Sequence, residues 1–263
     1  NSYAAGAVAG SSYYVGGLAG AISLSTIENS YATGTVSGVD SSVGGLVGGI
    51  GDSTITTSYA TGAVTGSSFA GGLVGVKSTE LSTVTNSFYD SDTTGKSDSD
   101  FGIPMSTEQM MEQKNYSGWD FTDTWYMIDG NTRPFLRMEY STNITNAHQL
   151  QLMQLDLDAD YTLANNIDMG ELTQASGLWN TSTGFDPIGN AWNVLFNGTF
   201  DGLGHTISGL VINRPDTDYV GLFGGTDNAA VSNVGVIGGS IEGDVFVGAL
   251  AGGIGSSTIT NSY

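Results

Sequence analysis

An acidic loop in the middle of the chain has the residue types and spacing of a calcium-binding loop. Asp90, Asp92 and Thr94 alternate with other residues, a glycine follows, and Asp98 stands at the ninth position. Hard cations such as Ca²⁺ prefer oxygen ligands in this arrangement. The twelfth position is Phe101, where a bidentate glutamate is expected. Two interpretations stay open: a structural Ca²⁺ at Asp90, Asp92, Thr94 and Asp98, or an acidic loop that faces solvent.

Carboxylates and a histidine in the second half of the chain are the candidates for catalysis on polysaccharides. Such reactions need paired carboxylates, or a base together with a cation. The candidates are Asp168, Asp186, Asp201 and His205. Asp201 precedes a glycine, which indicates a turn, and His205 fits a strand beside it. The structural interpretation is favoured, and we expect no enzymatic activity.

Three further patterns are typical of surface chemistry. Exposed tryptophans can stack on sugar rings, and the candidates are Trp119, Trp125, Trp179 and Trp192. For the two in the Trp-rich segment, core packing is the alternative.

Thr-x-Thr triplets, interrupted at Glu28, have the spacing of an ice-binding face and occur at 26–28, 54–56, 83–85 and 258–260. Asn-x-Ser/Thr triplets are glycosylation candidates at Asn115, Asn143, Asn180 and Asn197.

The composition excludes several classes of protein. Among 263 residues, 6 are Lys or Arg and 26 are Asp or Glu, so no cationic surface for nucleic acid or anionic lipid can form. The absence of cysteine removes disulfides, thiolate catalysis and Cys-zinc sites. No apolar run is long enough to span a membrane, and no signal peptide is visible at the start. A charge of −20 suits an exposed extracellular surface that must stay soluble, and it is also compatible with a cytosolic protein.

Internal repetition predicts the fold that must position these residues. A hexad of the form V-G-x-[LF]-x-G recurs at intervals of 27–28 residues, and segments such as NSYATG keep the same interval. Within each repeat, apolar residues follow one another at about nine-residue spacing, with Gly and Ser between them. This pattern predicts an all-β, right-handed parallel β-helix whose 27–28-residue coils each contain three strands.

Stacked coils place equivalent residues above one another, and this predicts ladders of identical side chains. Asparagines at the corners can form hydrogen bonds along the stack, and tyrosines can stack their rings. The residues assigned to these ladders are Leu18, Leu46, Leu73 and Leu250; Ile27, Ile55 and Ile259; Asn29, Asn86, Asn233 and Asn261; and Tyr3, Tyr31 and Tyr59.

The middle of the chain interrupts the repeat and predicts a small α/β insertion. Helix formers after Ser or Asn caps indicate helices over 106–113 and 146–155. Residues 196–212 are interpreted as two strands that meet at the Asp201-Gly202 turn. Four segments follow: coils over 1–94, a helical and Trp-rich segment over 95–140, a helix and strand over 141–195, and coils over 196–263.

The combination of VGGLVG, NSYATG, YTLANNIDM, FNGTFDGLGHTISGL and YVGLFG resembles the GLUG-motif repeat proteins of bacterial and archaeal cell surfaces. The segments FYDSDTTGKS, GWDFTDTW and RPFL are similar to those that close modules of that family. The resemblance, which extends to filamentous-haemagglutinin-like adhesins, implies an extracellular β-solenoid without known catalysis. Because the closing segment precedes the opening one, and NSY recurs 260 residues apart, we expect a tandem array of about 260-residue units.

Together these observations predict an extracellular structural repeat of a surface filament, matrix fibre or adhesin shaft. Its expected partner is itself, through head-to-tail continuation of the solenoid, and no cofactor is expected other than the Ca²⁺ considered above. The alternative is a carbohydrate- or host-binding adhesin domain that contacts surface glycans. A polysaccharide-active enzyme and an ice-binding protein are less favoured.

Overall fold

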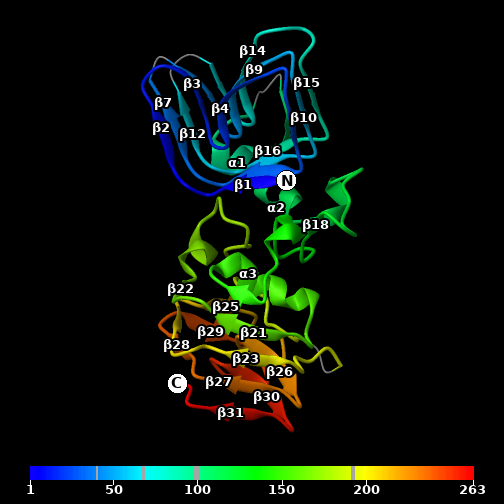
Figure 1. The fold of residues 1–263 in the computed structure, drawn as a ribbon, viewed down its shortest axis with the longest axis vertical. Coiled ribbons are helices and arrows are strands. Elements are labelled where there is room, and N and C mark those ends of the chain that lie inside the picture. Colours follow the sequence, from blue (N-terminus) through cyan, green and yellow to red (C-terminus); the bar gives the residue numbers. More distant parts are fainter. Residues whose placement is uncertain (40, 67–68, 98–100, 191–192) are drawn as a thin grey trace. The chain divides into compact units, whose positions relative to one another are not determined.

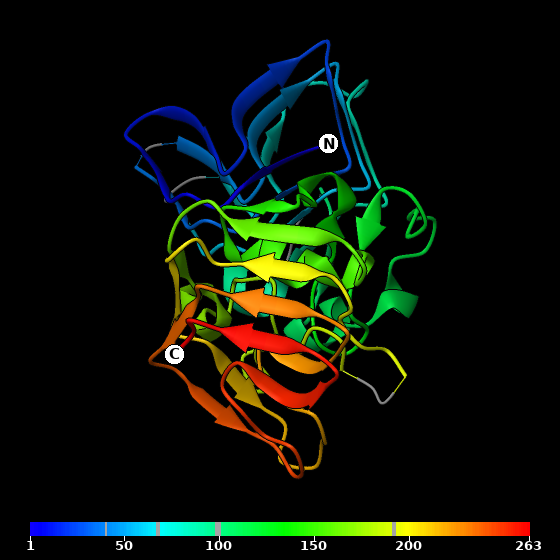
Figure 2. The same ribbon diagram turned by 60° about the horizontal axis from the view of Figure 1, so that its bottom comes forward.

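The computed structural model describes residues 1–39, 41–66, 69–97, 101–190 and 193–263. These residues form two compact units. Unit 1 comprises Asn1–Leu136 and Ala175–Leu178, and unit 2 comprises Arg137–Gln174 and Trp179–Tyr263. In each unit, successive turns of the chain stack short parallel strands on one another (Figures 1 and 2). The division into four segments that the sequence suggests stays a prediction.

Unit 1 is a stack of coils whose strands form five parallel sheets. Neighbouring strands of a sheet come from successive coils, so that Tyr3 pairs with Tyr31 and Val8 with Val36. In sheet order, the strands are β1 (Ser2–Ala4), β6 (Ser30–Ala32), β11 (Tyr59–Ala60), β16 (Phe88–Asp90) and β17 (Ile103–Met105); β12 (Val64–Gly66), β7 (Val36–Gly38) and β2 (Val8–Gly10); β13 (Phe69–Gly71), β8 (Ser41–Gly44) and β3 (Tyr13–Gly16); β14 (Val74–Lys77), β9 (Val47–Gly51) and β4 (Ala19–Ser23); and β15 (Thr83–Thr85), β10 (Thr54–Thr56) and β5 (Thr26–Glu28). The parallel β-helix predicted from the repeat is confirmed.

Each coil contains more strands than the nine-residue spacing predicts. The chain from β6 to β10 contributes five short strands, not three. The reason lies in the hexad, which bends at Gly45 and Leu46 between β8 and β9. Before the bend, Val43 packs in a valine cluster with Val15. After the bend, Leu46 packs in a second cluster, so one hexad serves two parts of the core.

The glycine in the hexad permits close stacking of the backbones. A Cβ on Gly45 would collide with the carbonyl oxygen of Gly72 in the next coil, and one on Gly17 would collide with that of Gly45. Any side chain at these bends would push neighbouring coils apart. Glycine is therefore required where the backbone of one coil lies directly on the next.

A helical and Trp-rich segment follows the coils of unit 1. It contains two short helices, α1 (Ser91–Thr94) and α2 (Thr107–Met110), a 3-10 turn η1 (Gln113–Asn115), and an antiparallel pair formed by β18 (Trp125–Tyr126) and β19 (Phe135–Leu136). Ser106 caps α2 in a capping box with Gln109. The helix predicted over 106–113 is present, but it ends at Met110.

Unit 2 is a second stack of parallel strands. Its sheets comprise β20 (Asn143–Ile144), β21 (Asp160–Leu163), β23 (Thr199–Asp201), β27 (Ala230–Ser232) and β31 (Thr258–Thr260); β22 (Ile167–Asp168), β24 (Thr206–Ser208) and β28 (Gly235–Ile237); β25 (Val211–Asn213) and β29 (Ser240–Glu242); and β26 (Phe223–Asp227) and β30 (Ala251–Gly255). Figure 2 shows β23, β27 and β31 as successive layers, coloured from yellow to red.

Helical turns alternate with the first strands of unit 2. They are η2 (Arg137–Glu139), α3 (Ala147–Leu152), η3 (Met153–Leu155) and η4 (Gly170–Thr173). Asn146 caps α3 by accepting from the backbone N–H of Gln149, so α3 and η3 together cover the helix predicted over 146–155. Among the described helices, none is both long and apolar enough to cross a membrane.

The two strands predicted to meet at the Asp201-Gly202 turn do not form a hairpin. A turn is present, closed by the hydrogen bond from the His205 N–H to the Gly202 carbonyl. The flanking strands, however, belong to different sheets, because β23 pairs with β21 and β27 while β24 pairs with β22 and β28. The prediction of two strands that meet at this turn is confirmed, and the turn is a corner of the coil because each strand pairs with strands of neighbouring coils.

Candidate functional site

The tyrosines of unit 1 form a continuous stack along the coils. The rings of Tyr3 and Tyr31 have centroids 5.2 Å apart, and those of Tyr31 and Tyr59 are 5.0 Å apart with an interplanar angle of 6°. The next position in register is Phe88. Tyr31 and Tyr59 are fully buried, whereas Tyr3 in the first coil is 40% exposed. The stack stabilises the coils by contact between nearest neighbours.

The aliphatic residues assigned to ladders also lie in register. Ile55 pairs with Ile27, and Ile259 of unit 2 pairs with Val231. The hexad leucines are joined through their backbones, since the Leu18 N–H donates to the Leu46 carbonyl and the Leu46 N–H donates to that of Leu73. In unit 2, the carbonyl of Leu250 accepts from the backbone N–H of Phe223.

The asparagines stand at corners that only a few residue types can form. Asn29, Asn86, Asn233 and Asn261 all have positive φ, between 45° and 54°. Asparagine tolerates this left-handed conformation better than other residues with a side chain. The corner side chains are also bonded between coils: Asn261 Nδ2 donates to Asn233 Oδ1 at 3.2 Å, and Thr57 Oγ1 donates to Asn29 Oδ1 at 2.6 Å.

The tryptophans do not form an exposed sugar platform. Trp125 and Trp179 are fully buried, and Trp119 is 7% exposed. Trp125 packs against the Tyr31 and Tyr59 rings, with centroids 6.3 and 6.0 Å away, and Trp119 lies 4.4 Å from Trp125. Trp119 and Trp125 therefore pack in the core, the interpretation favoured for the Trp-rich segment, and Trp179 is buried as well. Trp192 lies outside the described residues.

Asp90 has a structural role that differs from the predicted calcium ligand. Its Oδ1 accepts from the backbone N–H groups of Asp92 and Thr93 and caps α1. Its Oδ2 accepts from Thr107 Oγ1 and is paired with the Arg133 guanidinium, and both side chains of this ion pair are fully buried. The carboxylate therefore has a cation already, one that the chain itself supplies.

Two further residues considered as calcium ligands are engaged in hydrogen bonds within the chain. Asp92 Oδ2 accepts from the Thr107 backbone N–H, and Thr94 Oγ1 donates to the Asp90 carbonyl. Asp98 lies outside the described residues. Within the described part of the chain, no group of three or more His, Asp or Glu side chains is arranged to hold a metal ion.

A buried histidine between two glutamates was missed by the sequence reasoning. His148 Nδ1 lies 2.6 Å from Glu139 Oε2, and its Nε2 lies 3.0 Å from Glu171 Oε2. Burial alone favours the neutral ring, but the hydrogen bonds and charges of Glu139 and Glu171 outweigh it and raise the pKa of His148 to about 9. His148 is therefore a cation at neutral pH that joins α3 to η2 and η4.

The residues considered for catalysis each contact a different structural partner. Asp186 forms an ion pair with Arg214 at 2.8 Å, and Asp168 Oδ1 accepts from the Gly170 N–H. His205 Nδ1 lies 3.3 Å from Asn166 Oδ1. Asp201 Oδ1 accepts from Asn233 Nδ2 and from the Leu203 N–H, and these bonds lower the pKa of the Asp201 carboxyl.

The glycosylation candidates differ in how far their side chains are engaged. Asn143 and Asn197 are exposed, although Asn197 Nδ2 donates to Asp158 Oδ1. Asn115 is half-buried, and its Nδ2 donates to the Gln109 carbonyl and to Glu112 Oε2. Asn180 is half-buried and accepts from Ser182. Asn143 and Asn197 are thus the more accessible acceptors.

Threonine hydroxyls of the triplets at 54–56 and 83–85 form hydrogen bonds with one another between neighbouring coils. Thr54 Oγ1 lies 3.2 Å from Thr83 Oγ1, and Thr85 Oγ1 donates to Thr56 Oγ1 at 3.4 Å. In unit 2, Thr258 pairs in register with Ala230, so the ladder does not continue with threonine. These hydroxyls connect successive coils in unit 1.

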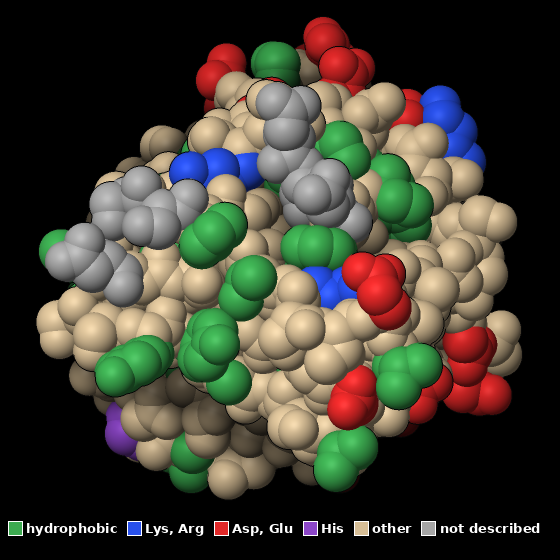
Figure 3. Space-filling view, turned by 90° about the horizontal axis from the view of Figure 1, so that it is seen from above, with side chains coloured by type: hydrophobic (Ala, Val, Ile, Leu, Met, Phe, Trp, Pro, Cys, Tyr) green, Lys and Arg blue, Asp and Glu red, His purple; other side chains and the backbone are tan. Residues whose placement is uncertain are grey.

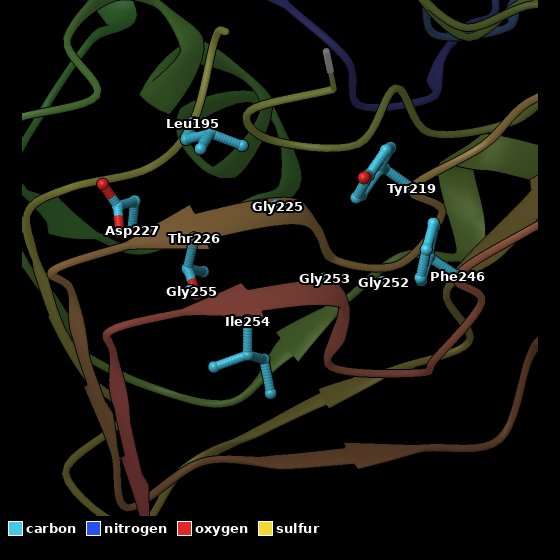
Figure 4. Close-up of a pocket in the computed structure, with 10 residues that line it drawn as sticks. All are labelled: Leu195, Tyr219, Gly225, Thr226, Asp227, Phe246, Gly252, Gly253, Ile254 and Gly255. Carbon is cyan, nitrogen blue, oxygen red and sulfur yellow. The ribbon is translucent and has the colours of Figure 1, made fainter. Parts of the chain in front are cut away.

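A groove lies on the surface of unit 2. Its volume is about 480 Å³, and it lies over β26 and β30 (Figure 4). The residues that line it are Leu195, Tyr219, Gly225, Thr226, Asp227, Phe246, Gly252, Gly253, Ile254 and Gly255. Hydrophobic side chains elsewhere are more scattered: the face seen in Figure 3 shows them dispersed over a largely polar surface.

Comparison with known proteins confirms the resemblance. The GLUG motif matches residues 11–37 and 40–65, which contain the first two hexads. The chain is similar to Halomucin of Haloquadratum walsbyi, with 44% identity over 95 residues, and to a protein named as a Gly-rich membrane protein of Evansella cellulosilytica, with 48% identity over 63 residues.

These matches cover parts of each protein. The Halomucin match covers 35% of this chain and 1% of Halomucin, and the second covers 22% of this chain and 7% of that relative. No solved structure matches the chain. The chain therefore carries GLUG motifs and shares its repeats with much longer proteins.

Proposed function

We propose that the chain is a structural segment of an extracellular, cell-surface repeat protein, in which stacked coils form the shaft of a filament, matrix fibre or adhesin. The support comes from the GLUG motifs, from relatives whose names refer to a mucin and to a membrane protein, and from the acidic composition. A surface of this charge stays hydrated and repels itself.

The observation that carries this proposal is the in-register stacking of backbone and side chains along both units. Strand β1 is an end strand of its sheet, and β31 is an end strand of the sheet in unit 2. An end strand presents unpaired backbone groups that a further parallel strand can satisfy. Extension by more coils therefore needs no new kind of contact.

The partner that fits these end strands is a further coil of the same kind, in a head-to-tail arrangement. The segment at Asn261 repeats that at Asn1, and a following coil with the sequence of residues 4–28 would keep the hexad interval. The Asn261 side chain already bonds to Asn233 one coil earlier, and Asn29 occupies the equivalent corner in unit 1.

Catalysis is not part of the proposed function. Asp168, Asp186, Asp201 and His205 are engaged in separate structural contacts, as described above. Incubation with a panel of polysaccharides should release no reducing sugar and no unsaturated product. Release of either would assign an enzymatic role and contradict this part of the proposal.

Electron microscopy of the native material tests the structural role. We expect elongated rods or filaments. Their axial repeat should equal the length of one tandem repeat of about 260 residues, with coils about 4.8 Å apart. Isolated compact particles at every protein concentration would contradict the proposed role as a shaft. A substitution of Ile259 by Lys in β31 should shorten the assemblies, whereas the same change at the exposed Thr258 should have a smaller effect.

A further inference from the structure

The groove over β26 and β30 has a floor of glycines. Gly225 pairs with Gly253, and Asp227 pairs with Gly255, in the two parallel strands. Side chains cover two of these glycines: a Cβ on Gly225 would be 2.5 Å from Leu195 Cδ2, and Gly253 lies under the ring of Tyr219. The glycines therefore give Leu195 and Tyr219 room to lie close to the two strands.

One end of the groove is an aromatic wall. The rings of Tyr219 and Phe246 are stacked, with centroids 4.8 Å apart and an interplanar angle of 19°. Tyr219 lies close to the floor, because a Cβ on Gly253 would be 2.8 Å from its Cδ1. Phe246 is 54% exposed, and Figure 4 shows both rings at the same end of the groove. Phe246 thus offers a flat apolar surface at this end of the groove.

The other end of the groove combines an aliphatic side chain with a carboxylate. Leu195 and Asp227 lie there, opposite the aromatic wall (Figure 4). Asp227 is half-buried, and it is the one lining residue that is charged at neutral pH. Its Oδ2 accepts from Asn228 Nδ2, and a carboxylate oxygen can accept further hydrogen bonds.

These features select the chemistry of a ligand. An anionic ligand is disfavoured by Asp227 and by the charge of −20 on the chain. A single ammonium group cannot contact both the carboxylate and the aromatic rings, because they lie at opposite ends. A neutral sugar chain satisfies both ends, since sugar rings have an apolar C–H face and several hydroxyl donors. The volume of about 480 Å³ lies within the range of ligand pockets.

We propose that this groove binds a short segment of a neutral oligosaccharide. One sugar ring stacks on Phe246, the sugar chain lies along the groove, and a hydroxyl at the far end donates to Asp227. The groove lies within unit 2 and does not depend on association of copies of the chain. Sugar binding can therefore be absent while the structural role holds, and the structural role can fail while the groove still binds sugar.

Isothermal titration calorimetry and saturation-transfer NMR on the 263-residue chain test the proposal. The probes are maltotetraose, cellotetraose and mannotetraose, with tetragalacturonate as an anionic probe and trilysine as a cationic one. We expect at least one neutral tetrasaccharide to bind, and tetragalacturonate and trilysine not to bind. Binding of trilysine or tetragalacturonate in preference, or of no probe at millimolar concentration, would overturn the proposal.

Variants locate the binding to the groove. Phe246→Ala should weaken binding about tenfold, the order expected for loss of one aromatic stack, while Phe246→Tyr should restore it. The matched control is Phe69→Ala, because Phe69 precedes a hexad in unit 1 and is 61% exposed but does not line the groove. Circular dichroism and the melting midpoint verify folding of each variant. Equal losses in Phe246→Ala and Phe69→Ala would overturn the assignment.

Discussion

At the scale of single residues, one set of equivalent corners shows how a left-handed backbone conformation favours asparagine, although Leu, Tyr and Phe have positive φ at other turns. The positive φ at the corners favours asparagine, and Asn29, Asn86, Asn233 and Asn261 follow this rule. Thr57 departs from it, since its φ is 44° and its side chain is β-branched. The Thr57 hydroxyl compensates for this conformation by donating a hydrogen bond to Asn29 Oδ1. The Asn261 Nδ2 donates in the same way to Asn233 Oδ1.

Thr57→Asn should therefore stabilise unit 1. Asparagine relieves the cost of a left-handed β-branched residue, about 1 kcal/mol, and can keep the bond to Asn29 in the manner of the Asn261–Asn233 pair. Urea unfolding monitored by circular dichroism measures the change. Thr56→Asn, on the preceding strand residue, is the control and should not stabilise the unit. A lower urea midpoint for Thr57→Asn would contradict the conformational argument.

His148 gives unit 2 a defined pH dependence. Because Glu139 and Glu171 raise the pKa of His148 from 6.5 in the unfolded chain to about 9, its contribution is fully present below pH 6.5 and is lost as the pH rises through 9. The melting midpoint of unit 2 should fall across this interval. His148→Gln should flatten the dependence between pH 6.5 and 9. An unchanged slope in that variant would show that another group is responsible.

At the scale of elements, an aromatic side chain before a hexad covers the glycine of the following coil. Tyr14 lies over Gly49 in unit 1, and Tyr219 lies over Gly253 in unit 2. Gly49→Ala should destabilise unit 1 by about 1–3 kcal/mol, because the new Cβ would be 2.5 Å from Tyr14 Cδ1. Adding Tyr14→Ala should recover part of this loss.

Gly6→Ala is the matched control for this prediction, because a Cβ there meets no atom within 4 Å. It should leave the urea midpoint nearly unchanged. If Gly6→Ala and Gly49→Ala cost the same, the effect would come from glycine in general and not from the ring over Gly49.

The buried ion pair fixes the helical and Trp-rich segment of unit 1 to strand β16. Arg133 is bonded to Asp90 and to the carbonyls of Ala175 and Gly177, which belong to the same unit. Arg133→Met should cost about 3–5 kcal/mol, since it leaves the Asp90 carboxylate buried without a cation. The double variant Asp90→Asn/Arg133→Met should be more stable than Arg133→Met in thermal unfolding. If it is not, the unpaired charge is not the cause.

The sequence predicted contacts that follow from the repeat, but not those that cross it. The register of Tyr3, Tyr31 and Tyr59 is set by a constant interval, so it could be read from spacing alone. Asp90 and Arg133 are 43 residues apart, and His148 meets Glu171 across 23 residues, with no repeating pattern to relate them. The sequence offered one indication that Arg133 has a structural role: Lys and Arg are rare in this chain, with 6 in total.

At the scale of the whole molecule, the net charge of −20 opposes association of copies. Because salt screens this repulsion, raising NaCl from about 10 mM to 500 mM should shift the chain toward larger species. Sedimentation velocity at matched protein concentrations measures the shift. The substitution of Ile259 by Lys in the end strand β31 should reduce it. Dissociation at high salt would show that charge pairs, and not coil stacking, hold copies together.

The spacing of the hydrogen bonds between coils also determines how the molecule responds to force. In unit 1, bonds such as Ser30 N–H to Ser58 Oγ join residues 28 positions apart, so each coil is held mainly by its immediate neighbours. Tension applied to the two ends should therefore peel one coil at a time. Each rupture would release the length of one coil, roughly 95 Å of extended chain, and dissipate energy in steps while the remaining coils stay folded.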